Sequence, residues 1–372
     1  MNKLNLTKVA NPNLKPSNLY VGGMTRDEVI EKIGDKKLYK LSSNENLLGP
    51  SPKALQAIKD HAHLIGEYPD RSDNRLREAL ATYYDDKLSG DEFVCGNSGS
   101  EVLEFICRAF LTDDSEYIVS NPCFKPYQMF SDKLGAKMVD VRLIENDDNY
   151  ELDVDGILAA INDKTRIIFL TSPNNPTGTY IPKATVYNLL DQLPDHVVVV
   201  YDEVYARYAD AADYAEATEF VAKGFPVIGL NSFSKLFGLA GLRLGYAYTT
   251  PEIADYIRRL YKPFIINIIG IEAGIAALSD EVFLQETTQL IKSERPRILA
   301  ALKEMGVKCW TSQSNFIQIR PEGDANQLVE DLLMEGIMVR PVAGFGSPGC
   351  VRVTIGTTEA NDAFLEALEK VK

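Results

Sequence analysis

Residues 230–246 read LNSFSKLFGLAGLRLGY and join two predicted strands, residues 227–230 and residues 244–248. Short apolar runs like these alternate with amphipathic helical patterns from about residue 93 to residue 249. This alternation is typical of βα units that build a mainly parallel sheet. The four valines at residues 197–200 are apolar on both faces, which predicts a central, fully buried strand. The sequence therefore predicts an α/β fold.

The opening stretch contains one lysine, Lys235, among hydroxyl side chains, glycines and one arginine. Ser234 and Leu236 would partly desolvate the amine, which lowers its pKa and favours the neutral, nucleophilic form able to make a Schiff base. Ser232, Ser234 and Arg243 are residue types that bind phosphate. A nucleophilic lysine beside a phosphate site indicates pyridoxal 5'-phosphate. The alternative is a solvated lysine beside a glycine-rich turn.

Polar or aromatic signatures also follow four other predicted strands of this sheet. They are residues 96–101 (GNSGSE), 121–124 (NPCF), 172–178 (SPNNPTG) and 201–205 (YDEVY). In open α/β sheets, ligands bind outside the carboxyl ends of the strands. The first of these turns would offer backbone N–H groups to a phosphate, and Phe124 could lie against a flat ring. Five such signatures predict one shared ligand site.

The length of 372 residues suggests more than one domain. Beyond about residue 250, long helical patterns give way to short strands of half-buried alternation, which indicates a smaller α+β domain. We expect an N-terminal arm and helix over residues 1–40, packing with the small domain. A large cofactor-binding domain over residues 41–255 and the small C-terminal domain over residues 256–372 would follow.

Charge and composition exclude several classes of function. The net charge of −14 argues against a nucleic-acid-binding surface and against adsorption to anionic membranes. The five cysteines are scattered, which is typical of free thiols in the cytoplasm. Three histidines give little material for a metal site, and none is expected. We also expect no signal peptide and no membrane-spanning segment.

Taken together, these motifs resemble the fold-type I, class I and II aminotransferases over almost the whole chain, and most of all the histidinol-phosphate aminotransferases. The resemblance is carried by NEN at 44–46, YPD at 68–70, NNPTG at 174–178, DE at 202–203 and the lysine stretch. It implies the pyridoxal-phosphate-dependent transferase fold of type I. It also implies ping-pong transfer of an amino group between L-glutamate or 2-oxoglutarate and histidinol phosphate or imidazole acetol phosphate, in histidine biosynthesis.

The resemblance also implies roles for the cofactor-facing residues. Lys235 would hold the cofactor and then move the proton in the transfer. Asp202 would pair with the ring nitrogen, and Phe124 would stack on the ring face. Asn175 and Tyr205 would hydrogen-bond the phenolic oxygen of the ring.

Further roles concern the cofactor phosphate, the partner subunit and the substrate. The residues implied at the phosphate are Gly99, Ser100, Glu101, Ser232, Ser234 and Arg243. Tyr68 would reach the phosphate of the neighbouring subunit, which implies a homodimer with shared sites. The residues implied at the substrate are Tyr20, Asn44, Arg340 and Arg352, with Arg352 on the donor's carboxylate.

One segment departs from the commoner family pattern. Tyr261 stands where an arginine is frequent, and Ile265 where an asparagine is frequent. Fewer polar groups there favour an aromatic amino-acid aminotransferase as the alternative. A pyridoxal-phosphate-dependent lyase or decarboxylase is a second alternative. A regulatory cofactor-binding module would need a DNA-binding extension and a basic patch, which this acidic chain has no room for.

Overall fold

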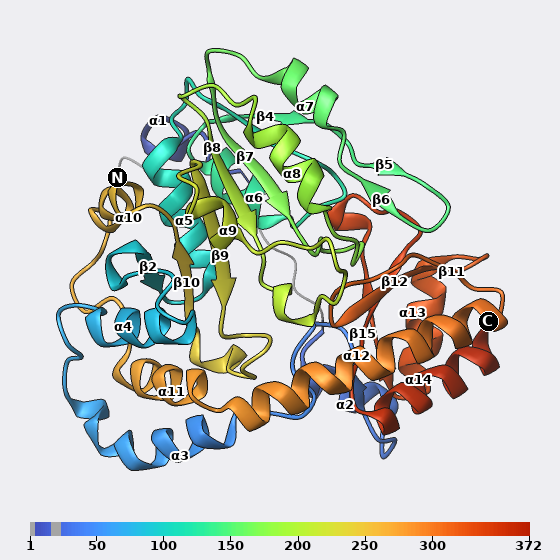
Figure 1. Ribbon diagram of the computed structural model, residues 1–372. Helices are drawn as coiled ribbons and strands as arrows, with labels where there is room; N and C mark the ends of the chain where they lie inside the picture. Colours follow the sequence, from blue (N-terminus) through green and yellow to red (C-terminus); the bar gives the residue numbers. More distant parts are fainter. Residues whose placement is uncertain (1–3, 16–23) are drawn as a thin grey trace.

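The computed structural model describes residues 4–15 and 24–372, and its largest element is a seven-stranded sheet (Figure 1). The strand order is β2-β10-β9-β8-β7-β3-β4. All neighbours are parallel except β10, which is antiparallel to β2 and to β9. The strands are β2 (Phe93–Gly96), β3 (Glu116–Val119), β4 (Lys137–Asp140), β7 (Thr165–Thr171), β8 (Val198–Asp202), β9 (Val227–Ser232) and β10 (Gly245–Tyr248). The predicted mainly parallel sheet is confirmed.

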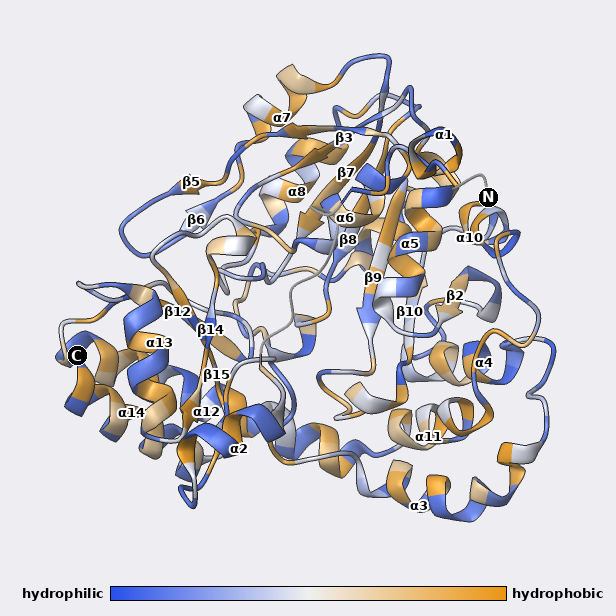
Figure 2. Ribbon diagram, turned by 180° about the vertical axis from the view of Figure 1, so that it is seen from behind, coloured by the Kyte–Doolittle hydropathy of each residue, from blue (hydrophilic) through white to orange (hydrophobic). Residues whose placement is uncertain are grey.

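Strand β8 lies in the middle of this sheet, as its valine run predicts. Val199, Val200 and Tyr201 are all fully buried. Helices cover both faces, and Figure 2 shows the hydrophobic strands enclosed between them. The covering helices are α5 (Gly99–Phe110), α6 (Pro126–Lys133), α7 (Val154–Ala160), α8 (Lys183–Leu190), α9 (Ala217–Val221) and α10 (Pro251–Arg258). Burial of apolar surface between these layers is the main source of stability.

A second, smaller sheet has four antiparallel strands in the order β11-β12-β15-β14. Its strands are β11 (Lys308–Cys309), β12 (Phe316–Arg320), β14 (Arg340–Pro341) and β15 (Val351–Thr354). Three helices accompany it: α12 (Glu281–Glu304), α13 (Ala325–Met334) and α14 (Thr358–Val371). Figure 1 shows the long helix α12 running from the side of the large sheet to this smaller sheet.

Helix α2 (Arg26–Ile33) packs against α13, where Val29 and Ile33 are buried with Leu333 and Met338. The remaining α-helices and strands of the described residues are α1 (Leu6–Val9), α3 (Pro52–His61), α4 (Asn74–Tyr83), α11 (Ile268–Leu278), β1 (Tyr39–Lys40), β5 (Ile144–Glu145), β6 (Tyr150–Glu151) and β13 (Ile337–Met338). The domain boundaries at residues 40 and 255 stay a prediction. Among the described residues, no helix is long and apolar enough to span a bilayer.

The parallel strands bring three polar residues to one edge of the large sheet. Thr171 ends β7 and lies beside Asp202, which ends β8, and Ser232 ends β9. Because β7, β8 and β9 run in the same direction, their carboxyl ends meet there. This edge is where the cavity described below is found.

Candidate active site

A cavity of about 570 Å³ lies at the carboxyl ends of β7, β8 and β9. Residues of both sheets line it, including Arg340 of β14 and Arg352 of β15. The sequence-predicted residues that line it are Asn44, Gly99, Ser100, Phe124, Asn175, Asp202, Tyr205, Ser232, Ser234, Lys235, Arg243, Arg340 and Arg352. Three predicted residues are not placed there: Glu101 and Tyr68 lie elsewhere, and Tyr20 is outside the described residues.

Lys235 enters the cavity from the loop that follows β9. Its Nζ donates a hydrogen bond to the Ser43 carbonyl oxygen at 2.8 Å. Burial lowers the pKa of Lys235 to about 7, and repulsion from the guanidinium groups of Arg352 and Arg243 adds to this effect. A large fraction of the amine is therefore unprotonated, and so nucleophilic, near neutral pH.

Asp202 presents a buried carboxylate to the same cavity. The Tyr127 hydroxyl donates to Oδ2 at 2.6 Å, and the Val204 N–H donates to Oδ1 at 3.2 Å. Burial raises the pKa of Asp202 to about 6, so the group is still mainly ionised at pH 7. Sequence reasoning missed Tyr127, a buried residue of α6 that also hydrogen-bonds Thr171 Oγ1 at 2.8 Å.

The N-terminus of α5 opens onto another part of the cavity through Gly99 and Ser100. The helix forms because Val102, Leu103 and Ile106 place a buried stripe on one face. Its first N–H groups and its dipole favour an anion. A Cβ at Gly245 would lie 2.1 Å from the Gly99 nitrogen, so only glycine permits this approach of β10.

Two serine hydroxyl groups and one arginine also line the cavity. Ser232 Oγ accepts from the Ser234 N–H at 3.1 Å, which fixes the loop before Lys235. Arg243 has a left-handed backbone with φ of 53°, and its Nη1 donates to the Ala240 carbonyl at 2.9 Å. Both serines and the arginine line the cavity, together with the start of α5.

Glu101 caps the turn before α5 and does not face the cavity. Its N–H donates to Ser98, to the carbonyl at 3.1 Å and to Oγ at 3.4 Å. Its carboxylate accepts from the Asn97 N–H at 2.7 Å. Tyr68 is 81% exposed, and its ring stacks on Phe264 with 4.7 Å between ring centroids.

The smaller sheet contributes a buried arginine. Arg352 Nη1 donates to Asn175 Oδ1 at 2.6 Å, and Nη2 donates to the Ser42 carbonyl at 2.8 Å. Because the Asn175 oxygen accepts from Arg352, the amide NH₂ is the group that it can offer to a ligand as a donor. The Tyr205 hydroxyl accepts from Asn44 Nδ2 at 3.0 Å, which orients it in the cavity wall.

The rest of the wall is largely apolar, and sequence reasoning missed most of it. The residues concerned are Leu103, Pro126, Met129, Phe130 and Phe345. Met129 and Phe130 belong to α6, where a helical apolar pattern reads as ordinary core packing. The available signal was their position shortly after the 121–124 turn, at a strand end.

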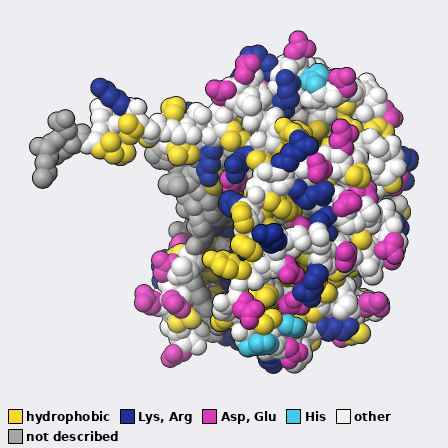
Figure 3. All heavy atoms as spheres, turned by 90° about the vertical axis from the view of Figure 1, so that its left-hand side faces the viewer, with side chains coloured by type: hydrophobic (Ala, Val, Ile, Leu, Met, Phe, Trp, Pro, Cys, Tyr) yellow, Lys and Arg dark blue, Asp and Glu magenta, His cyan; other side chains and the backbone are white. Residues whose placement is uncertain are grey.

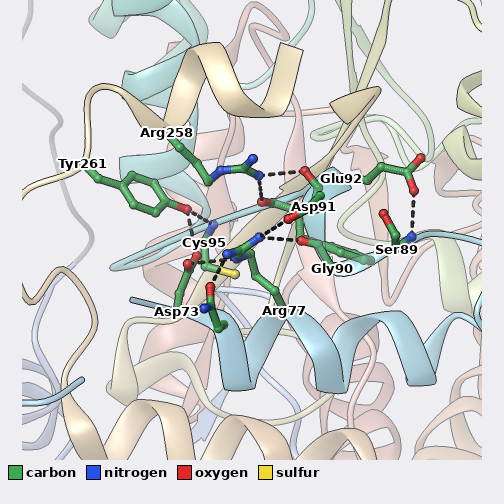
Figure 4. A network of polar contacts seen from close by, with 11 residues as sticks. Asp73, Arg77, Ser89, Gly90, Asp91, Glu92, Cys95, Arg258 and Tyr261 are labelled. Atoms are coloured by element: carbon green, nitrogen blue, oxygen red, sulfur yellow. Dashed lines mark hydrogen bonds and ion pairs between the residues drawn. The ribbon is translucent and has the colours of Figure 1, made fainter. Parts of the chain in front are cut away.

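Tyr261 and Ile265, which gave the reason for doubting a phosphorylated imidazole substrate, do not line this cavity. Tyr261 lies at the outer edge of β2, where its hydroxyl accepts from the Cys95 N–H and donates to Asp73 (Figure 4). Ile265 is also buried, at 7% exposure. These two residues therefore give no reason to prefer one substrate over the other, and the aromatic amino-acid alternative stays a prediction.

A family model described as aminotransferase class I and II matches residues 36–368. The chain belongs to the class I and II aminotransferases. Among curated relatives of this aminotransferase, histidinol-phosphate aminotransferase 1 of Idiomarina loihiensis is 34% identical over 372 residues and is covered completely, as is this chain. Histidinol-phosphate aminotransferase 1 of Dechloromonas aromatica is 38% identical over 354 residues, 94% of this chain and 95% of the relative.

Solved structures agree with this assignment of the aminotransferase. The histidinol-phosphate aminotransferase of Sinorhizobium meliloti, in complex with pyridoxal-5'-phosphate, has a TM-score of 0.85 and 27% identity, with 98% of each chain covered. That of Clostridium acetobutylicum has a TM-score of 0.81 and 28% identity, with 90% of this chain and 99% of that chain covered. The type I fold expected from the sequence is confirmed.

Proposed function

We propose that this aminotransferase holds pyridoxal 5'-phosphate on Lys235 and moves an amino group between L-glutamate and the 2-oxo partner of histidinol phosphate. One observation carries the proposal: an amine of pKa about 7, a buried carboxylate and a helix N-terminus face a single cavity. Pyridoxal phosphate has an aldehyde, a basic ring nitrogen and a phosphate, which these three groups complement.

The residues present fit this cofactor. Asp202 would hold a protonated ring nitrogen, and Phe124 would cover the ring face. The Asn175 amide and the Tyr205 hydroxyl would hold the phenolic oxygen. The groups that would hold the phosphate are Ser232, Ser234, Arg243 and the N–H groups at Gly99 and Ser100. Gly245 at the start of β10 approaches Gly99 at the start of α5 closely, and this brings Arg243 and the N–H groups of α5 together.

The bound cofactor would supply an electron sink for bond changes at the amino-bearing carbon. Lys235 Nζ would take a proton from that carbon and then donate it two atoms away, which completes a 1,3 proton shift. An amine of pKa about 7 suits this role because it exchanges protons readily near pH 7. Arg352 would orient the donor's carboxylate from the smaller sheet. The apolar wall around Phe345 would exclude water from the reacting atoms.

The substrate proposal is supported by the names of the curated relatives and by the charges in the cavity. Arg340 and Arg352 are two guanidinium groups in one cavity, and they suit acidic substrates. L-glutamate carries two carboxylates, and histidinol phosphate carries a phosphate. The apolar side chains of Met129 and Phe130 offer a surface for the flat imidazole ring.

A panel of amino donors with 2-oxoglutarate as acceptor tests the substrate. We expect kcat/KM for histidinol phosphate to exceed that for phenylalanine by at least about 100-fold, because the uncharged phenyl ring would leave Arg340 without an ionic partner. Glutamate formation is the readout. Arg340→Met should remove most of this preference by raising KM for histidinol phosphate alone.

The matched control is Arg320→Met on β12, because Arg320 is half exposed and pairs with Glu145 away from the cavity. It should leave the donor preference unchanged. A preference for phenylalanine would replace the substrate with an aromatic amino acid. Loss of carbon dioxide or ammonia, with no glutamate formed from any donor, would replace transamination with lyase or decarboxylase chemistry.

We also propose a homodimer in which Tyr68 completes the site of the partner subunit. Tyr68 and its stacking partner Phe264 are exposed, and Ile65, three residues before Tyr68 in the sequence, is 74% exposed. Figure 3 shows hydrophobic side chains gathered on one face of the molecule. Near the N-terminus, Leu6 and Val9 of α1 are more than half exposed. Apolar surface of this kind is typical of a subunit interface.

Mixed dimers test the shared site. Refolding equal amounts of Lys235→Ala and Tyr68→Ala chains should restore about a quarter of wild-type activity, because half of the dimers are mixed and each has one intact site. Each variant alone should stay well below that level. The readout is transamination at fixed chain concentration, with the dimer mass checked by sedimentation. A monomeric wild type, or mixing with no gain, would contradict the shared site.

The cytoplasmic location remains part of this proposal. The five cysteines, Cys95, Cys107, Cys123, Cys309 and Cys350, are all unpaired. Free thiols persist in reducing compartments. Four of the five are buried, and burial raises the pKa of Cys107 to about 12, which keeps that thiol protonated and unreactive.

A further inference from the structure

Residues 258–265, which we call the edge segment, run along the outer edge of β2. Strand β2 is the first strand of the large sheet and pairs only with β10. Arg258 Nη1 donates to the carbonyls of Asp91 and Phe93 at 2.7 and 2.9 Å. Tyr261 Oη accepts from the Cys95 N–H at 2.6 Å (Figure 4). The edge segment therefore satisfies backbone groups that an edge strand leaves without a strand partner.

The Tyr261 hydroxyl also anchors a buried carboxylate. It donates to Asp73 Oδ2 at 2.9 Å, and Asp73 Oδ1 accepts from Arg77 Nε at 3.0 Å (Figure 4). Asp73 is only 3% exposed, so the loss of either partner would leave a buried charge short of a hydrogen bond. The Tyr261 ring packs on Phe105 of α5, with 5.9 Å between centroids. One side chain thus joins β2, α4 and α5.

Residues 96–100 connect the last residue of β2 to the first residues of α5, and we call them the phosphate turn. Gly99 and Ser100 of this turn line the cavity. Ser98 has φ of 88°, a conformation that serine rarely adopts and that persists only where surrounding contacts hold it. The Asn97 side chain donates to the Ile265 carbonyl. The edge segment therefore holds the chain at Cys95 and at Asn97, on the side away from the cavity.

We propose that Tyr261 is a positioning residue for the cofactor phosphate. Its hydroxyl holds the Cys95 N–H of β2 and so fixes the phosphate turn that follows. This inference rests on the proposed function. Tyr261 itself does not line the cavity. A hydroxyl both accepts from an N–H and donates to a carboxylate, whereas a guanidinium only donates. Tyrosine therefore fits the position between Cys95 and Asp73 in a way that arginine cannot.

The test is Tyr261→Phe in the full-length chain freed of cofactor, with dissociation constants measured by equilibrium dialysis. The ring stays on Phe105, but the hydroxyl is lost. We expect the constant for pyridoxal 5'-phosphate to rise about tenfold, because the anchor of the phosphate turn is gone. The constant for pyridoxal, which lacks the phosphate, should change less than about twofold. This selectivity is what a merely structural role would not produce.

The matched control is Tyr256→Phe in α10, because the Tyr256 ring is half exposed and packs on Phe110. It should change neither constant. Equal weakening of both ligands by Tyr261→Phe, or no weakening, would overturn the positioning role while leaving the proposed function intact. A wild-type chain that binds pyridoxal phosphate no more tightly than pyridoxal would instead overturn the proposed phosphate site, and this inference with it.

Discussion

Lys235→Ala is expected to lower turnover by about 10⁴-fold or more, because it removes both the nucleophile and the proton carrier. Lys235 is the only lysine among the described residues that line the cavity, so no neighbouring amine replaces it. The measurement is steady-state transamination with glutamate and the 2-oxo acceptor at saturating substrate. The substitution also removes a desolvated amine that Arg352 repels, so the cofactor-free chain should be no less stable to urea.

Two further variants separate the possible reasons for such a loss. Lys235→Arg keeps a positive charge but offers no nucleophile, because a guanidinium stays protonated at every pH of interest. It should be as inactive as the alanine variant. Lys183→Ala removes a half-exposed lysine of α8 that pairs with Glu219, and it should retain full activity. Normal turnover in Lys235→Ala would sink the assignment of the catalytic residue.

Asp202→Asn is expected to lower kcat by about 10³-fold, because the amide cannot supply the charge that keeps a ring nitrogen protonated. The amide has nearly the same shape: its oxygen can accept from the Val204 N–H, and its NH₂ can donate to the Tyr127 hydroxyl oxygen, which reverses the direction of that one hydrogen bond. The fold and the cofactor content should therefore change little. The measurement is kcat, together with cofactor content after gel filtration.

Asp140→Asn is the matched control, because Asp140 ends β4 as Asp202 ends β8, but it does not line the cavity. It should leave kcat within about twofold of wild type, as surface substitutions usually do. Tyr127→Phe removes the hydroxyl that donates to Asp202 and should have an intermediate effect of about tenfold. A kcat for Asp202→Asn near that of the wild type would show that the carboxylate has no role in the reaction.

The part of the site that the sequence predicts best lies at strand ends. Lys235, Asp202 and Asn175 follow buried strands of one parallel sheet, so their convergence follows from the fold class alone. Arg340 and Arg352 come from a second sheet, and only the family resemblance indicated that they reach the same cavity. Nothing in local periodicity encodes how the two sheets face one another.

The residues that sequence reasoning missed or misplaced share a physical reason. Tyr127 sits on a helix whose apolar pattern reads as core, and its hydroxyl meets Asp202 only because the folded chain brings this side chain to the ends of β7 and β8. Tyr261 was assigned to the substrate side by resemblance, but the chain after α10 turns along the outer edge of β2. In both cases tertiary packing, which a single sequence does not specify, decided the contact.

The central claim is that Lys235 carries the cofactor, and one measurement tests it directly. The holoenzyme is reduced with borohydride, which makes the link between a lysine amine and pyridoxal phosphate permanent, and its proteolytic peptides are analysed by mass spectrometry. We predict that the added pyridoxyl phosphate mass lies on Lys235 alone. Labelling of a different lysine, or of none, would contradict the account.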